Sequence, residues 1–165
     1  MNNVIFLDID GVLNSNFWND SHQKEISNGT LIDIEKIKLL AKLVKNTNAK
    51  LILHSGWRFW YNSNLEPTRK ESENLSKLLQ QEDIVIDGMT PDFSTEEIRK
   101  SKKFSLVKAS EILTWLAEHE EVDKWIVIDD LDLHNPEIEI HQIKTDSAVG
   151  LTIEDIQKAK KMLLC

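Results

Sequence analysis

Three short, almost unbroken apolar runs constrain the fold of this chain more than any other feature. The runs cover residues 4–7, 50–54 and 125–128. Unbroken apolarity is typical of strands that are buried on both faces of a parallel sheet, whereas alternation is typical of strands with one exposed face. Two weaker strand candidates are residues 84–86 and the alternating residues 138–143, and we expect the alternating strand at an edge of the sheet.

Helical periodicity fills the segments between these strands. Apolar residues recur at three-to-four spacing in segments 31–44, 106–119 and 153–164, and a further helix is expected near residues 71–79. Thr30 is the expected cap of the first helix, and Thr152 with Asp155 forms a variant of the capping box at the last. Strands that alternate with helices need crossover connections. The sequence therefore predicts a three-layer α/β sandwich with a Rossmann-like, mainly parallel sheet and the first strand at its centre.

Length and composition are those of one soluble globular domain spanning residues 1–165. Apolar residues make up 41% and charged residues 29% of the chain, and no Pro- or Gly-rich linker divides it. No apolar run approaches the roughly 20 residues that cross a bilayer, and the N-terminus lacks the pattern of a secretory signal. The single cysteine, Cys165, excludes an internal disulfide. We therefore expect a cytoplasmic protein without a membrane partner.

Polar residues follow each of the three main strands. Asp8 and Asp10 follow the first, Ser55 the second, and Asp129 with Asp130 the third. Ligands of an open parallel sheet bind beyond the carboxyl ends of its strands, so these side chains are the candidates for chemistry. Several carboxylates in one small volume need a bound cation or raised pKa values, and hard oxygen ligands of this kind select Mg²⁺.

A carboxylate at such a site can also attack phosphorus. It then forms an aspartyl-phosphate and splits one difficult displacement into two easier ones. Of the pair Asp8 and Asp10, the second aspartate can protonate the leaving oxygen and later activate water. Gly11 permits the tight turn that brings backbone N–H groups toward a phosphoryl group.

The run of residues 8–14 resembles the first motif of the haloacid dehalogenase (HAD) superfamily, whose members are mostly Mg²⁺-dependent phosphatases. The resemblance implies that Asp8 is the nucleophile and a metal ligand. It implies that Asp10 is the acid and base and offers its backbone carbonyl to the metal. Ser55 resembles the second motif, a hydroxyl that binds the transferring phosphoryl group, and Asp129–Asp130 resembles the acidic fourth motif, with Asp130 as the better direct metal ligand.

The third motif of the superfamily is a single lysine or arginine before the last catalytic strand. Lys108 stands at the expected distance from Asp129, and Lys102 and Lys103 are close rivals that the sequence does not separate. A cation at this position would offset the phosphoryl charge that develops in the transition state.

A narrower resemblance covers almost the whole chain. The residues that carry it are 8–14, 55–58, 111–116, 128–130, 145–146 and 150–152. Together they resemble the compact HAD domain of Swiss Army Knife RNA repair proteins. This resemblance implies a HAD-like fold and, as one substrate, a phosphorylated nucleic-acid end.

The stretch after the presumed phosphate-binding serine is a second candidate for substrate contacts. Gly56, Trp57 and Arg58 are interpreted as substrate-binding, with the aromatic cluster of residues 57–61 as a stacking platform and Arg58 as a phosphate ligand. The alternative is that at least one of these tryptophans is a core residue. The net charge of −8 disfavours nonspecific nucleic-acid binding, so the basic run of residues 99–103 is either a substrate flank or a solvated helix face.

Other polar residues near the strand ends are weaker candidates. His54 is expected to be structural, His134 to approach the acidic loop, and Asp132 and Asp146 to be either metal-adjacent groups or ordinary loop carboxylates. The segments that connect the motifs are short, and most of their residues belong to the expected helices and strands. We therefore predict a capless or minimally capped domain with an open site, which suits a large phosphorylated substrate.

The first functional hypothesis is a Mg²⁺-dependent phosphomonoester hydrolase that acts through an aspartyl-phosphate on Asp8. Two alternatives stay open at this point. One is a noncatalytic module that keeps the fold and the metal for phosphate binding or regulation. The other is a phosphotransferase that passes the phosphoryl group to an acceptor other than water.

Overall fold

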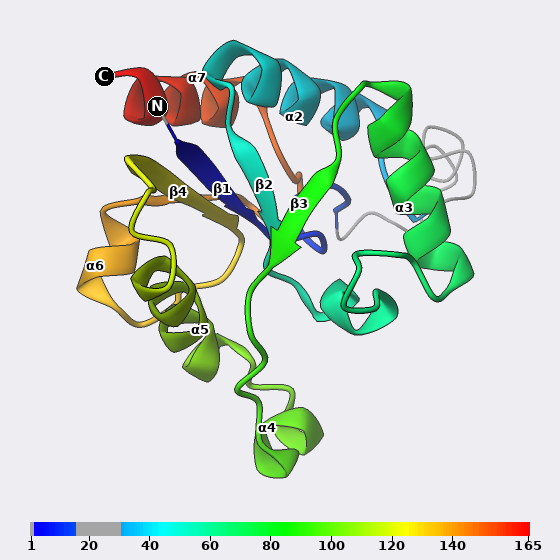
Figure 1. Cartoon of the computed structure of the whole chain (residues 1–165), viewed down its shortest axis with the longest axis vertical. Helices are drawn as coiled ribbons and strands as arrows, with labels where there is room; N and C mark the ends of the chain where they lie inside the picture. Colours follow the sequence, from blue (N-terminus) through cyan, green and yellow to red (C-terminus); the bar gives the residue numbers. More distant parts are fainter. Residues whose placement is uncertain (1, 16–30) are drawn as a thin grey trace.

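The computed structural model describes residues 2–15 and 31–165 and contains one five-stranded parallel sheet (Figure 1). The strands are β1 (Asn3–Leu7), β2 (Lys50–Leu53), β3 (Ile86–Met89), β4 (Lys124–Asp129) and β5 (Gln142–Lys144). Their order across the sheet is β3-β2-β1-β4-β5, and every neighbouring pair is parallel. The predicted α/β class, parallel sheet and central first strand are confirmed.

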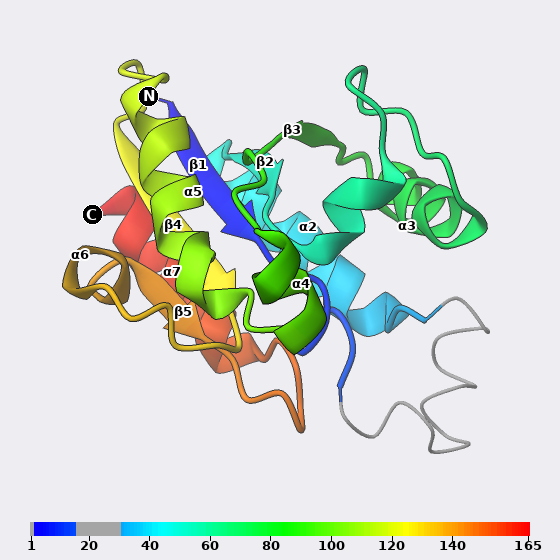
Figure 2. The ribbon, with the colours of Figure 1, turned by 90° about the horizontal axis from the view of Figure 1, so that it is seen from below.

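Helices cover both faces of the sheet. The longer ones are α2 (Ile34–Thr47), α3 (Lys70–Gln81), α5 (Ser105–Ala117) and α7 (Ile153–Leu164). Shorter ones are the 3₁₀ helix η2 (Gly56–Trp60), α4 (Glu96–Ser101) and α6 (Pro136–Glu139). Helices α2, α3 and α7 pack on one core, and α5 and α6 pack on the other, so the described residues form three layers (Figures 1 and 2).

The central strand, β1, contributes side chains to both hydrophobic cores, because successive side chains of a strand point to opposite faces of the sheet. Ile5 and Leu7 join the core under α2, α3 and α7, whereas Val4 and Phe6 join the core under α5 and α6. All four side chains are at most 1% exposed. Burial on both faces explains why the sequence of β1 is unbroken rather than alternating in apolarity.

The predicted strand over residues 138–143 is partly wrong. Residues Pro136–Glu139 form helix α6, and only Gln142–Lys144 pairs with β4, at the edge of the sheet. The Asn135 side chain accepts hydrogen bonds from the backbone N–H groups of Glu137 and Ile138, and Pro136 occupies the first helical turn. These are strong helix-start signals, and they outweigh the apolar alternation.

Helices α2 and α7 each begin directly after a residue whose side chain caps the first turn. Helix α2 begins at Ile34, where the Asp33 side chain accepts from the backbone N–H of Glu35 at 2.9 Å; the expected cap, Thr30, lies outside the described residues. The predicted capping box of α7 is confirmed, because Thr152 and Asp155 each accept from the other's backbone N–H. Strand β3 begins at Ile86, two residues later than expected. In the described parts of the chain, no helix has the length and apolarity needed to cross a bilayer.

Candidate functional site

The residues expected to carry chemistry meet where the three central strands end. Asp8 follows β1 directly, Ser55 lies two residues beyond β2, and Asp129 is the last residue of β4. The ladder continues past the strands, since the Asp8 N–H donates to the Ile128 carbonyl at 3.0 Å and the His54 N–H donates to the Leu7 carbonyl at 2.8 Å. Parallel register therefore brings these side chains to one edge.

Three aspartates form a carboxylate cluster at this edge. Asp8, Asp129 and Asp130 each contribute an oxygen, and these oxygens lie within 4.8 Å of one another. Asp8 and Asp129 are buried, and Asp130 is half-buried. Three close carboxylates are stable only when charge or protons offset their repulsion.

Lys108 supplies one positive charge to the cluster. It lies on α5, and its Nζ is 2.7 Å from Asp129 Oδ2 and 3.6 Å from Asp8 Oδ1. Its two rivals lie elsewhere: Lys102 is the C-cap residue that follows α4, and the side chains of Lys102 and Lys103 are both exposed. Among the three candidate lysines, the structure brings only Lys108 to the aspartates.

Burial and the neighbouring charges shift the pKa values of the residues in this site. Burial raises the pKa of Asp8 well above its usual range; Lys108 opposes this effect, and the charges of Asp129 and Asp130 add to it. Burial also raises the pKa of Asp130. For Lys108, burial disfavours the charged form, but the carboxylates of Asp8 and Asp129 outweigh it and raise the pKa.

The chemistry of the cluster fits a hard divalent cation. Three carboxylates face one ammonium group, which leaves an excess of acidic oxygen ligands in a partly buried space. Asp129 already uses both oxygens, since Oδ2 accepts from Lys108 and Oδ1 accepts from the Leu131 N–H at 2.9 Å. Asp8 and Asp130 are therefore the members with oxygens left for a metal ion such as Mg²⁺.

The side chain of Asp10 is exposed and lies outside this carboxylate cluster. Its Oδ1 accepts from Asn14 Nδ2 at 3.0 Å, and its Oδ2 accepts from the indole Nε1 of Trp57 at 3.3 Å. Asn14 also accepts from the backbone N–H of Gly11 at 2.9 Å. Asp10 is thus held beside the cluster by the turn that follows β1.

Gly11 makes this turn possible. Its φ is +81°, and a Cβ atom there would lie 2.5 Å from Asp130 Oδ2. The Gly11 carbonyl accepts from the buried hydroxyl of Thr145, just after β5, at 2.8 Å. Thr145 was no site candidate by sequence, although it is a polar residue at a strand end. Gly56, by contrast, is exposed, and a Cβ atom there would meet no other atom within 4 Å.

Ser55 begins the loop that follows β2. Its side chain is 1% exposed, and its Oγ accepts from the backbone N–H of Trp57 at 3.2 Å, which caps η2. A serine in this position still has its own O–H to donate. The hydroxyl is therefore compatible with the expected contact to a phosphoryl oxygen.

Trp57 is a core residue rather than an open platform. Its side chain is 4% exposed and lies next to Trp60, with ring centroids 4.9 Å apart. The buried ring leaves no face for a stacked base, so the expected stacking on Trp57 does not fit the structure. Phe59 is the exposed aromatic residue of the cluster.

Arg58 is not available as a phosphate ligand. All three guanidinium nitrogens donate to protein atoms: Nε to the Ser55 carbonyl, Nη1 to Thr90 and Pro91, and Nη2 to Glu111. Burial of Arg58 explains the difference, because a buried guanidinium must satisfy its donors within the protein. Arg58 instead stabilises the segment that begins at Ser55, through its hydrogen bond to the Ser55 carbonyl.

Glu111 is the buried partner that sequence reasoning did not single out. It lies on α5, accepts from Arg58 and also accepts from the backbone N–H of Phe93 at 2.8 Å. Burial raises the pKa of Glu111, against the effect of Arg58. Glu111 is three residues after Lys108, so one face of α5 carries both.

The remaining candidates are not members of the carboxylate cluster. His54 is buried, its Nδ1 is 3.0 Å from Thr90 Oγ1, and burial lowers its pKa well below the usual range, which agrees with a structural role. Asp132 and His134 are exposed, with 3.8 Å between His134 Nδ1 and Asp132 Oδ2. The Asp146 side chain accepts from the Ala148 N–H within a turn.

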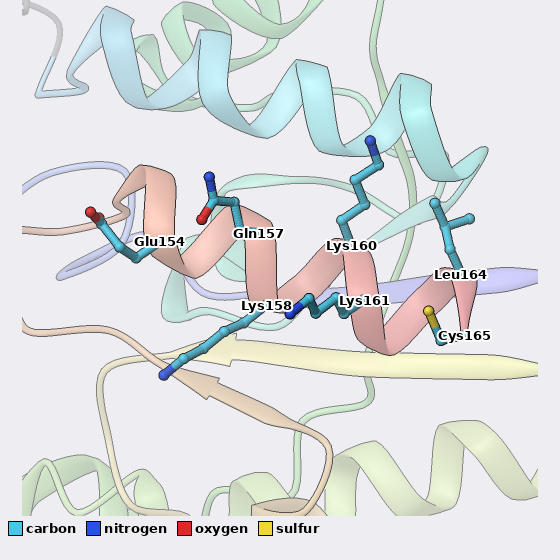
Figure 3. Close-up of a pocket in the computed structure, with 7 residues that line it drawn as sticks. All are labelled: Glu154, Gln157, Lys158, Lys160, Lys161, Leu164 and Cys165. Atoms are coloured by element: carbon cyan, nitrogen blue, oxygen red, sulfur yellow. The ribbon is translucent and has the colours of Figure 1, made fainter.

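A surface pocket of about 580 Å³ lies along α7 (Figure 3). Its lining residues are Glu154, Gln157, Lys158, Lys160, Lys161, Leu164 and Cys165. All of them belong to α7 or the residue that follows it, and none follows a strand. This pocket is separate from the candidate site.

Comparison with known proteins identifies the family. A search of curated proteins gave no match, and a search of solved structures gave none either. The model of the family described as the HAD domain in Swiss Army Knife RNA repair proteins matches residues 4–156, a range that contains every member of the carboxylate cluster. The chain therefore belongs to this family of HAD domains.

Proposed function

We propose that this protein is a Mg²⁺-dependent phosphomonoester hydrolase that acts through an aspartyl-phosphate on Asp8. HAD domains are generally hydrolases, which supports the reaction class. The observation that carries the proposal is the placement of Asp8: it is buried at the end of the central strand, beside two further aspartates and 3.6 Å from Lys108 Nζ. A carboxylate placed in this way can act as a nucleophile toward phosphorus.

The side chains of Asp8 and Asp130, with the backbone carbonyl of Asp10, would hold the metal ion. Bound Mg²⁺ would neutralise charge on the phosphoryl oxygens. Lys108 offsets charge from the other side, because it is fixed between Asp8 and Asp129. Ser55 would donate its O–H to a phosphoryl oxygen.

In the first step, a carboxylate oxygen of Asp8 attacks phosphorus as the bond from phosphorus to the leaving oxygen breaks. Asp10 gives its proton to that oxygen, so the product leaves as an alcohol. In the second step, Asp10 takes a proton from water, the water oxygen attacks phosphorus, and the bond to Asp8 breaks. Inorganic phosphate and the starting carboxylate result.

Replacing Asp8 with Asn tests the proposal. The wild-type protein should release phosphate from phosphomonoesters in the presence of Mg²⁺ and not after chelation, and Asp8→Asn should reduce the rate by at least about 10³-fold. Unchanged turnover in this variant would contradict the role of Asp8. Binding of Mg²⁺ and phosphoesters without turnover across a broad substrate panel would favour a noncatalytic module instead.

The lysine assignment has matched controls. Lys108→Met should reduce turnover by about 10²-fold or more, because it removes the charge nearest the nucleophile. Lys102→Met and Lys103→Met should retain near-wild-type turnover, since both side chains are exposed. Loss of activity in an exposed-lysine variant but not in Lys108→Met would transfer the role to that residue.

The substrate class is part of the proposal. The name of the family links its members to RNA repair, and we propose a phosphorylated nucleic-acid end as the substrate. A phosphorylated oligonucleotide should then be hydrolysed with a higher kcat/KM than sugar phosphates or mononucleotides. A preference for the small molecules would contradict this substrate, and transfer of phosphate to added alcohols or nucleosides would indicate a phosphotransferase.

A further inference from the structure

A hydrogen bond between two loops joins Trp57 to Asp10. The indole Nε1 of Trp57 donates to Asp10 Oδ2 at 3.3 Å, although the two residues are 47 positions apart in the chain. We infer that Trp57 is a positioning residue, which holds the carboxyl group of Asp10 in the orientation needed for proton transfer to the leaving oxygen. The catalytic part of this inference depends on the proposed hydrolase function.

Trp57 is itself held in place at two points. Its backbone N–H donates to Ser55 Oγ at 3.2 Å, and its ring is buried next to Trp60. A rotation that broke the contact with Asp10 would have to displace a packed ring. Trp57 therefore contacts Ser55 through its backbone N–H and Asp10 through its packed indole ring.

Both oxygens of Asp10 have donors within the protein. Asn14 Nδ2 donates to Oδ1 at 3.0 Å, and Trp57 Nε1 donates to Oδ2. An exposed aspartate with free torsions would sample several orientations, of which few direct a proton at the leaving oxygen. Two donors on different oxygens restrict both side-chain torsions, and each oxygen keeps a second lone pair that can carry the proton given to the leaving oxygen or taken from water.

A simpler explanation is that a buried indole N–H needs any acceptor, and that Asp10 merely provides one. The two explanations differ in their kinetic consequences. If Trp57 positions the general acid, loss of its N–H must slow substrates whose leaving oxygen needs a proton. Substrates with a good leaving group, which depart as an anion, must be affected much less.

The experiment uses Trp57→Phe, which removes the N–H but keeps an aromatic ring in the core. The matched control is Trp60→Phe, the same change in the neighbouring ring. Each variant is assayed with Mg²⁺ on an alkyl phosphate and on p-nitrophenyl phosphate. Trp57→Phe should lower kcat/KM at least about tenfold for the alkyl phosphate and less than about threefold for p-nitrophenyl phosphate. Trp60→Phe should show no such selectivity.

An equal loss on both substrates, or no loss on either, would overturn the inference. Asp10→Asn provides a further test, because Trp57→Phe should add no selectivity in that background. Additive effects on the alkyl phosphate would show that Trp57 acts independently of Asp10 and would also overturn the inference.

An NMR measurement separates failure of this inference from failure of the proposed function. Asp10→Ala should shift the indole N–H signal of Trp57 and leave that of Trp60 nearly unchanged; an unmoved Trp57 signal would exclude the contact in solution. If the wild-type protein releases phosphate neither from these two esters nor from a phosphorylated oligonucleotide, the proposed function and the catalytic role of Trp57 fail together. A shifted signal would then show that the failure lies in the function and not in the contact.

Discussion

Asp8 shows at the scale of one residue how a buried carboxyl group opposes folding stability. Its carboxyl group is buried, and burial raises its pKa well above the usual range. Between the ordinary aspartate pKa of about 3.9 and the raised value, the folded state binds more protons than the unfolded state. Folding stability must therefore fall as the pH rises through this window. In the metal-free protein, the ionised carboxylate of Asp8 is therefore a destabilising group.

We predict that Asp8→Asn raises the melting temperature of the metal-free protein, because Asn cannot ionise. At neutral pH and with a chelator, a gain of about 1 kcal/mol would correspond to a rise of about 2–4 °C. The difference between variant and wild type should vanish at pH values below the ordinary aspartate pKa and grow as pH rises. Thermal melts over a pH series measure it.

Asp132→Asn is the control for this prediction, because it removes an exposed carboxylate outside the carboxylate cluster. It should change the melting temperature little at any pH. Added Mg²⁺ should stabilise the wild type more than Asp8→Asn, since the variant lacks one ligand. An Asp8→Asn protein that melts below the wild type at all pH values would contradict the conclusion that the ionised Asp8 carboxylate destabilises the metal-free protein.

At the scale of elements, two threonine caps are expected to contribute differently to stability, because their helices bury different amounts of apolar surface. Thr152 caps α7, whose residues Ile156, Ala159 and Leu163 are buried in the core. Thr95 caps α4, which has six residues and buries none of them. Both hydroxyls accept from a backbone N–H at 3.2 Å. Only the first cap stabilises a helix that is coupled to the core.

We predict that Thr152→Ala lowers the free energy of unfolding by about 1 kcal/mol, the usual effect of losing a cap. Thr95→Ala should leave the global value unchanged and increase hydrogen exchange only in α4. Denaturant unfolding and hydrogen exchange distinguish these results. An equal global loss in both variants would mean that α4 unfolds together with the core.

At the scale of the whole molecule, the site depends on a close approach of two distant loops. Gly11 follows β1 and Asp130 follows β4, and only the parallel pairing of these strands brings them together. A Cβ atom on Gly11 would lie 2.5 Å from Asp130 Oδ2 and 2.6 Å from its Cγ. The positive φ of Gly11 adds backbone strain for any other residue.

We therefore predict that Gly11→Ala lowers the free energy of unfolding by about 1–3 kcal/mol and weakens Mg²⁺ binding, because the Ala methyl group displaces Asp130. Gly56→Ala is the matched control, since its Cβ would meet no atom within 4 Å. Thermal melts and Mg²⁺ titration measure both effects. Wild-type Mg²⁺ affinity in Gly11→Ala would exclude Asp130 as a ligand in this position.

Much of the fold was predictable because its signals are local. Unbroken apolarity located β1, β2 and β4, and the carboxylate cluster of Asp8, Asp129 and Asp130 lies at the ends of β1 and β4. Local signals also misled where they competed. The alternation of residues 138–143 indicated a strand, but the Asn135 cap and Pro136 start a helix there instead.

The sequence by itself determined the positions of the main strands and of the longer helices, and it placed Asp8, Ser55 and Asp130 at strand ends, because periodicity depends on local residue types. The tertiary structure decided which lysine joins the aspartates and which residues of the Ser55 loop face inward. Lys108 reaches Asp129 because α5 turns it toward the sheet, Arg58 donates to the buried Glu111, and Trp57 donates to Asp10. Such contacts depend on packing between segments far apart in the chain, which no local pattern records.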